Sequence, residues 1–294
     1  MSTQRAWMGL ALAIVLAGPC EADERSLSPV DSALIAIIPT RDGIVLATDN
    51  GHSSSEAICN GVGNIVIPTR DLRVAVVFTG TAHVATTTGT SASTCDEIAR
   101  NKLDLRKVIH GYLDAIQDES AIDLRRLSHL LMQDVSSLQA LSQTLTHPSA
   151  VERRGTVLLA FAVVSYDPAN KSARVGVAAL TVGNDDRISP TVVSDQVFSS
   201  SSPALLLLFG KTALVQEQVF GGNGSEYLDW EKVDAISQRK VRELGQATVV
   251  PALRSIFVAA ARVAVETTKT YSTGEIAQFV LVGDGRQPEL IDPR

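Results

Sequence analysis

Runs of apolar residues separated by turn residues dominate the first part of the chain. Residues 33–38 (ALIAII) and 43–49 (GIVLATD) flank the corner PTRDG, in which proline restricts φ and Asp-Gly suits a tight turn. Residues 64–67 (NIVI) and 73–80 (RVAVVFTG) repeat this arrangement around a second PTRD. The first two runs do not alternate polar with apolar positions, so both faces of these strands are expected to be covered. The pattern predicts two β-hairpins.

Helical spacing follows the two hairpins. Residues 81–101 are rich in small side chains and predict a weak helix, and residues 103–117 predict a second helix or its extension. In residues 123–145 leucine and valine recur every three or four positions. This spacing predicts an amphipathic helix, with Asp123 as its N-cap.

The second half of the chain repeats the order of strands and helices and ends in a hairpin. Helices are predicted over residues 203–220, 229–245 and 248–269, and the first opens with Pro203, a favoured first helical residue. Antiparallel strand pairs with helices in blocks between them predict an α+β fold of stacked layers. We expect one domain over residues 32–294. Its remaining strands are predicted over residues 156–167, 173–180, 190–199, 275–283 and 288–292.

The first 22 residues have the pattern of a secretory signal peptide. Arg5 precedes the apolar run 7–18 (WMGLALAIVLAG), and the small residues Cys20 and Ala22 follow it. The run is shorter than the roughly 20 apolar residues that a membrane span needs, so no stable membrane span is expected. A retained anchor or a lipid-modified Cys20 is the alternative. The mature protein is expected to be secreted or periplasmic, with residues 23–31 as a lead or pro-segment.

Composition narrows the possible partners. The net charge is −6, aromatic residues make up 4%, and no basic run occurs, which argues against nucleic acid as a partner. Cys59 and Cys95 remain after loss of the signal peptide, and outside the cytosol such a pair is expected to form a disulfide. Two separate buried thiols are the alternative. The five histidines are scattered without a Cys/His cluster, so we predict no metal. The chain has no P-loop, and residues 221–224 (GGNG) read as a loop, so we predict no cofactor.

Four stretches, in this order, resemble proteasome subunits. IAIIPTRDGIVLATDNG resembles their opening strand, corner and second strand, and GNIVIPTRDLRVAVVFTGTAHVA resembles their next hairpin. TVLLAFAVVSYDPANKSARVGVAAL is similar to a later hairpin, and STGEIAQFVLV to the closing strand. The resemblance extends from about Ser32 to the carboxyl end. It implies the fold of N-terminal-nucleophile hydrolases, a four-layer αββα sandwich in which two antiparallel sheets lie between helical layers.

The resemblance also implies a reaction. In that family a Thr, Ser or Cys freed at the amino terminus attacks a carbonyl, and its own α-amine, with a pKa of about 8, acts as the base. A lysine lowers the pKa of this amine, and an acid at the end of the second strand supports the lysine. Asp49 matches that acid, although Asp-Asn-Gly is also turn chemistry in its own right.

The nucleophile and the lysine do not match. Counting back without gaps places the nucleophile at Ala33, which has no attacking group. Ser32 is one residue away, and a shift of one residue turns a strand side chain to the other face. No lysine occurs before Lys102. Lys269 stands where the family has an acid, whereas Ser272, and Ser200 or Ser201, match structural serines of the family.

Two functions follow from this comparison. We expect a proteasome-subunit-like protein that has lost catalysis and acts in assembly or binding, most simply as a homo-oligomer. The alternative is an active peptidase or other amide hydrolase acting on a peptide or protein. In that case Ser32 is the nucleophile and Asp49 its supporting acid.

Overall fold

The computed structural model describes residues 34–49, 65–80, 83–85, 102–143, 157–182, 187–209, 214–268 and 277–291. The expected signal peptide and lead segment lie outside the described residues. The residues of the sequence-based site predictions that also lie outside them are Ser32, Ala33, Cys59, Cys95, Lys269 and Ser272.

The first sheet is built around the opening hairpin. β1 (Ile35–Thr40) and β2 (Gly43–Thr48) pair in antiparallel register from Ile35↔Thr48 to Thr40↔Gly43. Every residue of both strands is buried, which confirms the expectation drawn from their unbroken apolar runs. The full order is β10-β1-β2-β11-β12. The other three strands are β10 (Leu207–Phe209), β11 (Gln278–Gly283) and β12 (Glu289–Ile291).

The second sheet is also antiparallel and five-stranded, in the order β3-β4-β7-β8-β9. Its strands are β3 (Ile65–Val66), β4 (Val74–Gly80), β7 (Val157–Asp167), β8 (Ser172–Val182) and β9 (Ile188–Phe198). The two sheets face each other across one apolar layer, to which Ile37 and Leu46 contribute from the first sheet and Val77 and Val164 from the second. A separate pair is formed by β5 (His83–Ala85) and β6 (Lys102–Asp104).

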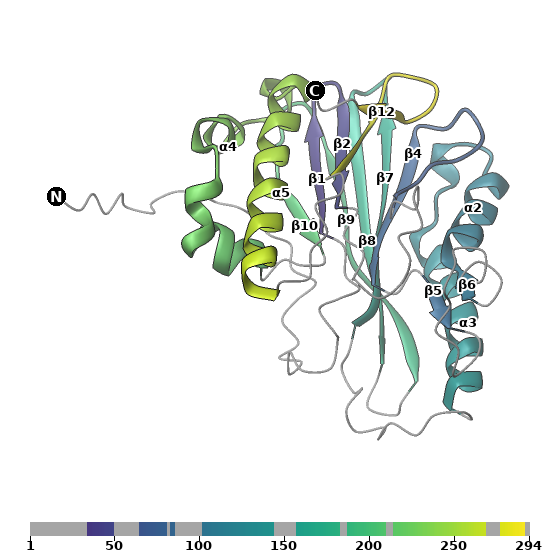
Figure 1. Ribbon diagram of the computed structural model, residues 1–294. Coiled ribbons are helices and arrows are strands. Elements are labelled where there is room, and N and C mark those ends of the chain that lie inside the picture. The colour runs from purple at the N-terminus through teal and green to yellow at the C-terminus, as the bar shows by residue number, and fades with distance from the viewer. Residues whose placement is uncertain are drawn as a thin grey trace.

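Helices cover the outer face of each sheet (Figure 1). α4 (Trp230–Ile236) and α5 (Gln246–Thr268) lie on the first sheet, and α2 (Leu105–Ala115) and α3 (Leu124–Gln143) lie on the second. The chain therefore forms a four-layer αββα sandwich, which confirms the predicted fold class. Asp123 caps α3 as predicted, since its Oδ1 accepts hydrogen bonds from the backbone N–H groups of Arg125 and Arg126 at 2.9 and 3.1 Å.

α5 is the central helix of its layer. Its stretch Gln246–Glu266 is long and apolar enough to cross a membrane by length and composition, and 56% of its most apolar window is buried inside the protein. At its start, Asp42 Oδ2 in the β1–β2 turn accepts the backbone N–H of Gln246 at 2.9 Å. This bond satisfies one of the helix's unpaired N–H groups and joins the helix to the opening hairpin.

Two of the predicted helices are corrected by the structure. Residues 203–220 do not form one buried helix: Pro203 forms an isolated bridge with Lys240, β10 pairs with β1, and a π-helical segment, η3, follows over Leu214–Phe220. The leucine run covers the open edge of β1, where a strand satisfies backbone groups that a helix would leave unpaired. Residues 229–245 also divide, because α4 ends at Ile236 and a short 3₁₀ helix, η5, follows over Val241–Glu243.

The predicted helices between the hairpins need a smaller correction. Within residues 81–101 the described part, His83–Ala85, is strand β5. Its partner β6 occupies the start of the predicted helix 103–117, so α2 begins only at Leu105. Antiparallel pairing thus outweighs helix preference at His83–Ala85 and Lys102–Asp104, and the rest of residues 81–101 lies outside the described residues.

Candidate functional site

The start of β1 and the end of β2 form the edge of the sandwich at which Asp49, the predicted supporting acid, lies. The backbone N–H of Leu34 donates to Asp49 Oδ1 at 2.9 Å, and the backbone N–H of Asp49 donates to the Leu34 carbonyl at 3.0 Å. Asp49 is only 9% exposed, and Leu34 is 1% exposed. The carboxylate thus satisfies a buried amide at the point where the β1–β2 ladder ends.

β10 and β11 pair with the two strands of the hairpin at this edge, one on each side. Phe209 of β10 pairs with Ile35, and Gln278 of β11 pairs with Thr48. The buried Thr48 hydroxyl donates to the Asp49 carbonyl at 3.2 Å. Hydrogen bonds through both its backbone N–H and its side chain therefore hold Asp49 against Leu34.

The expected nucleophile cannot be placed relative to Asp49 from the described residues. Ser32 precedes Leu34 by two residues and is not among the described residues, and neither are Lys269 and Ser272. The structure places the Asp49 carboxylate on the backbone N–H of Leu34. The role of Ser32 and Asp49 in a reaction remains a prediction.

The serines of residues 199–202 do not belong to this edge. The Ser200 carbonyl accepts the N–H of Arg242 at 3.0 Å, and the Leu244 carbonyl accepts the N–H of Arg41 at 2.9 Å. Arg41 lies in the turn between β1 and β2, at the opposite end of the hairpin from Asp49. Ser200 therefore lies near the hairpin turn, and the match of Ser200 or Ser201 to a structural serine of the family stays a prediction.

Charged groups gather at the opposite end of the sandwich, around the hairpin turn. Burial raises the pKa of the Tyr166 hydroxyl, and the nearby carboxylates of Asp284, Asp42 and Asp167 raise it further. Tyr166 is thus held in its protonated form and is unsuited to act as a base at neutral pH. Within the described ranges, no three His, Cys, Asp or Glu side chains form a group that could hold a metal ion.

Sequence reasoning singled out Asp49 but missed its partner. The Leu34 amide carries no side-chain signal, and only the pairing register brings it to the carboxylate. A cavity between β1, α4 and α5 was also missed, because its lining comes from segments spread between Ile38 and Ile256. No local pattern marks residues that meet only through the fold.

Comparisons with known proteins add little to this geometry. No protein-family model matches the sequence, and no curated protein matches it. Among solved structures, the chain is similar to an Anbu mutant from Hyphomicrobium sp. strain MC1, at 8% sequence identity and a TM-score of 0.39. The match covers 88% of this chain and 87% of that chain. A likeness this distant carries no argument about chemistry, and the αββα architecture rests on the strand order and helical layers of this chain.

Proposed function

We propose that this chain is an exported, proteasome-subunit-like protein that acts through assembly or binding and not through catalysis. The observation that supports this best is the hydrogen bond between Asp49 Oδ1 and the backbone N–H of Leu34 at 2.9 Å. Asp49, the residue matched to the family's supporting acid, accepts a backbone hydrogen bond at the end of the β1–β2 pair. A carboxylate in this place stabilises the hairpin whether or not a nucleophile stands nearby.

The sequence beside this bond supports the same conclusion. Ala33, at the position matched to the nucleophile, has no hydroxyl or thiol, and the first lysine of the chain is Lys102. A free α-amine would therefore lack the neighbouring lysine that lowers its pKa in the family. If Asp49 is kept for its backbone hydrogen bond, it is expected to persist in a chain that has lost both the nucleophile and the lysine, as this sequence has.

The decisive experiment determines the amino terminus of the mature protein. Amino-terminal sequencing and intact mass are expected to show a start near Asp23, so that the Ser32 nitrogen stays in a peptide bond. An electrophile that acylates N-terminal Ser or Thr is expected to leave the protein unlabelled. A mature chain that begins at Ser32 and is labelled there, with Ser32→Ala abolishing the labelling, would overturn the proposal.

The second candidate is amide hydrolysis by a freed Ser32. It is favoured by the burial of Asp49 next to Leu34, two residues from that serine. The Ser32 hydroxyl would attack the amide carbonyl, and its proton would pass through the α-amine to the leaving nitrogen. Water would then hydrolyse the ester that remains. Turnover of amide substrates that is lost in Ser32→Ala but kept in Ala33→Gly would favour this candidate.

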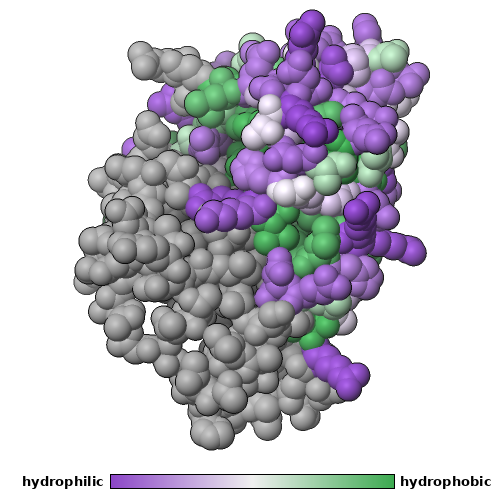
Figure 2. Space-filling view, turned by 90° about the vertical axis from the view of Figure 1, so that its right-hand side faces the viewer, coloured by the Kyte–Doolittle hydropathy of each residue, from purple (hydrophilic) through white to green (hydrophobic). Residues whose placement is uncertain are grey.

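Self-association is part of the first proposal. Figure 2 shows the face formed by the α2 and α3 layer, where hydrophobic residues gather between hydrophilic ones. Val108 of α2 and Leu130 and Met132 of α3 are only partly buried. Light scattering is expected to give a multiple of the mature chain's mass, and Leu130→Glu is expected to lower it. Val265→Glu, on the other helical layer, is the control, and a monomer at all concentrations would contradict self-association.

A further inference from the structure

β9, the last strand of the second sheet, lies at an open edge. Its 11 residues pair with β8 on one side, and no strand of the described chain pairs with the other side. An edge strand of this length presents a row of unpaired N–H and C=O groups, which can pair with a strand of another chain. β9 is therefore a candidate contact surface.

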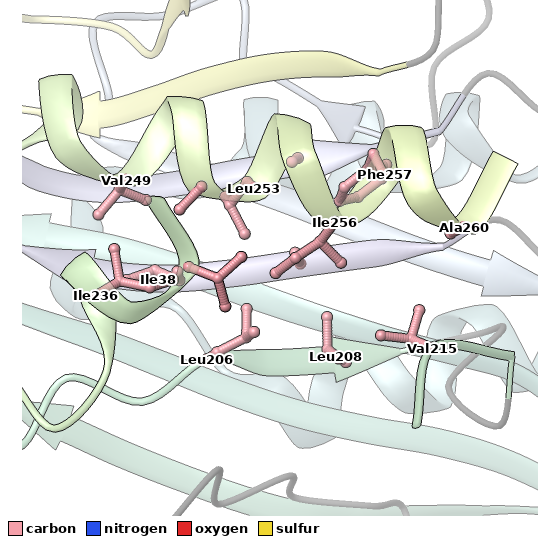
Figure 3. Close-up of a cluster of buried hydrophobic side chains, with 14 of the residues drawn as sticks. Ile38, Leu206, Leu208, Val215, Ile236, Val249, Leu253, Ile256, Phe257 and Ala260 are labelled. Carbon is pink, nitrogen blue, oxygen red and sulfur yellow. The ribbon is translucent and has the colours of Figure 1, made fainter. Parts of the chain in front are cut away.

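Side chains of β9 stay open to solvent along most of the strand. Within this described strand only Phe198 is buried, whereas Val192 is 40% exposed and Val197 is 66% exposed. Ile38 of β1 shows the contrast, since it lies beneath Leu253 of α5 (Figure 3). β9 thus keeps apolar surface that the rest of the described fold does not cover.

A bulge places both exposed valines on the same face of β9. The pairing with β8 passes from Ser194 to Val192 and leaves Val193 as an extra residue. Without this residue Val192 and Val197 would point to opposite faces, because side chains alternate along a strand. Ala178, opposite Val192, belongs to the core beneath α2 and α3, so both valines lie on the face that these helices cover in part.

Pro190 indicates which way the backbone groups of β9 point. A proline has no N–H, so within a sheet it stands where its nitrogen faces away from the neighbouring strand. Backbone direction alternates along a strand, so Val192, two residues further on, also directs its N–H and C=O away from β8. The open edge therefore offers the donor and the acceptor of Val192 to a second strand.

The sequence of β9 is complementary to itself about Val192. In an antiparallel pair with a two-fold axis at this residue, Val192 faces its own copy and Val197 faces Ile188, when the bulged residue is left out of the register. Polar side chains meet on the opposite face: Thr191 with Ser194 and Ser189 with Gln196. Apolar side chains thus face apolar ones, and polar side chains face polar ones.

Electrostatics permits two copies of this strand to meet. Asp195 is the one charged residue of β9, and in this register it lies opposite Pro190 of the second copy. Arg174 of β8 already neutralises it, since its Nε and Nη2 donate to the carboxylate at 2.9 and 2.7 Å. Like charges directly opposite each other destabilise a strand pair, and none meet in this register.

We propose that two copies of this chain pair through β9, antiparallel about Val192, and so join their second sheets into one. The bulge at Val193 bends the strand and interrupts its outer ladder, so the contact is weak and depends on concentration. The inference rests on the proposed self-association but concerns a surface other than the α2 and α3 layer. An extended segment of a different protein is the other possible occupant of this edge.

Charge changes at the two-fold axis test the register. Val192→Lys and Val192→Glu each place like charges opposite each other, and each is expected to weaken association about tenfold in sedimentation equilibrium. In an equal mixture lysine faces glutamate, and association is expected to recover to within about threefold of that of the unchanged protein. Val265→Lys and Val265→Glu on α5, where the valine is also 40% exposed, are the matched controls, and neither is expected to change association.

Two further measurements separate this contact from the α2 and α3 layer. The series is repeated in Leu130→Glu, where association through β9 is expected to remain. Hydrogen exchange of the Val192 amide is expected to slow as protein concentration rises, because the second strand covers it. The Thr191 amide faces β8 and is expected to exchange at one rate throughout, which also shows that the variants keep the β8–β9 pair.

Equal association of Val192→Lys and the unchanged protein would overturn the proposal, and so would a mixture of the two Val192 variants that associates no better than either alone. If Leu130→Glu abolishes association and Val192→Lys does not affect it, the β9 contact is refuted and the proposed function stands. A protein that stays monomeric, with fast exchange at Val192 at every concentration, would refute both and would leave the edge to a different protein.

Discussion

The bond between Asp49 and Leu34 makes a quantitative prediction about the opening hairpin. Asp49→Ala removes the oxygen that accepts the Leu34 N–H at 2.9 Å, in a place where both residues are buried. Water reaches this amide poorly, so the donor is left largely unsatisfied. Asp49→Asn keeps an oxygen of the same shape in the same position and therefore serves as the matched comparison.

The expected cost follows from the burial of the donor. An unsatisfied buried N–H costs about 1–3 kcal/mol, so we take about 2 kcal/mol for Asp49→Ala. For a domain of this size that corresponds to a fall in melting temperature of about 4–8 °C. Asp49→Asn is expected to retain more than half of the lost stability, because its side-chain carbonyl can still accept the bond.

Urea unfolding at neutral pH, followed by circular dichroism, measures both variants against the unchanged protein. Hydrogen exchange of the Leu34 amide gives a local readout, and faster exchange is expected in Asp49→Ala than in Asp49→Asn. If Asp49→Ala is as stable as the unchanged protein, or if Asp49→Asn is destabilised as much as Asp49→Ala, the structural role assigned to the carboxylate is refuted.

Three further predictions concern the rest of the fold. Gly43→Ala is expected to lower stability by more than about 2 kcal/mol, since φ is +137° and a Cβ would lie 2.3 Å from the Val282 carbonyl oxygen; normal stability in thermal unfolding would contradict this. Leu253 is fully buried in α5, and Leu253→Ala is expected to lower the free energy of unfolding in urea by about 2–5 kcal/mol. A loss below about 1 kcal/mol would contradict the packing of α5 against the first sheet. The Arg174 guanidinium holds the pKa of Asp195 below its usual value through a side-chain hydrogen bond. Because the folded pKa is the lower one, the pair's contribution is complete above the unfolded pKa of about 3.9 and is lost as pH falls through the folded pKa. Asp195→Asn is expected to cost under about 1 kcal/mol at pH 7, given the exposure of both side chains, and nothing once the carboxyl is protonated; a pH-independent difference would contradict it.

The local sequence was sufficient to predict an element when the structure of that element depends mainly on its own residues. The apolar runs around PTRDG predicted β1 and β2, because residues that are buried on both faces leave no polar side to display. Asp123 was predicted as the cap of α3 because a short carboxylate just before a helix can reach the first free N–H groups. The layered α+β architecture followed from the order of such elements.

Stretches whose sequence suits a helix and a strand equally well took their structure from contacts with distant parts of the chain. The run PALLLLF suits a buried helix or a buried strand equally well, since an apolar segment of this length shows no clear period. Its last three residues form β10 because Ile35, Ala36 and Ile37 present an open sheet edge that needs backbone partners. That edge is far away in sequence, so no window around residue 207 contains the information.

The candidate sites divide in the same way. Sequence alone marked Asp49 as an acid after a strand and showed that no lysine precedes Lys102. Only the pairing register placed the Asp49 carboxylate on the Leu34 amide, and only helix packing brought Ile38, Leu206 and Ile256 together around one small cavity. Residue type and local period are properties of neighbours along the chain, whereas a hydrogen bond or a cavity between distant segments exists only after the chain has folded.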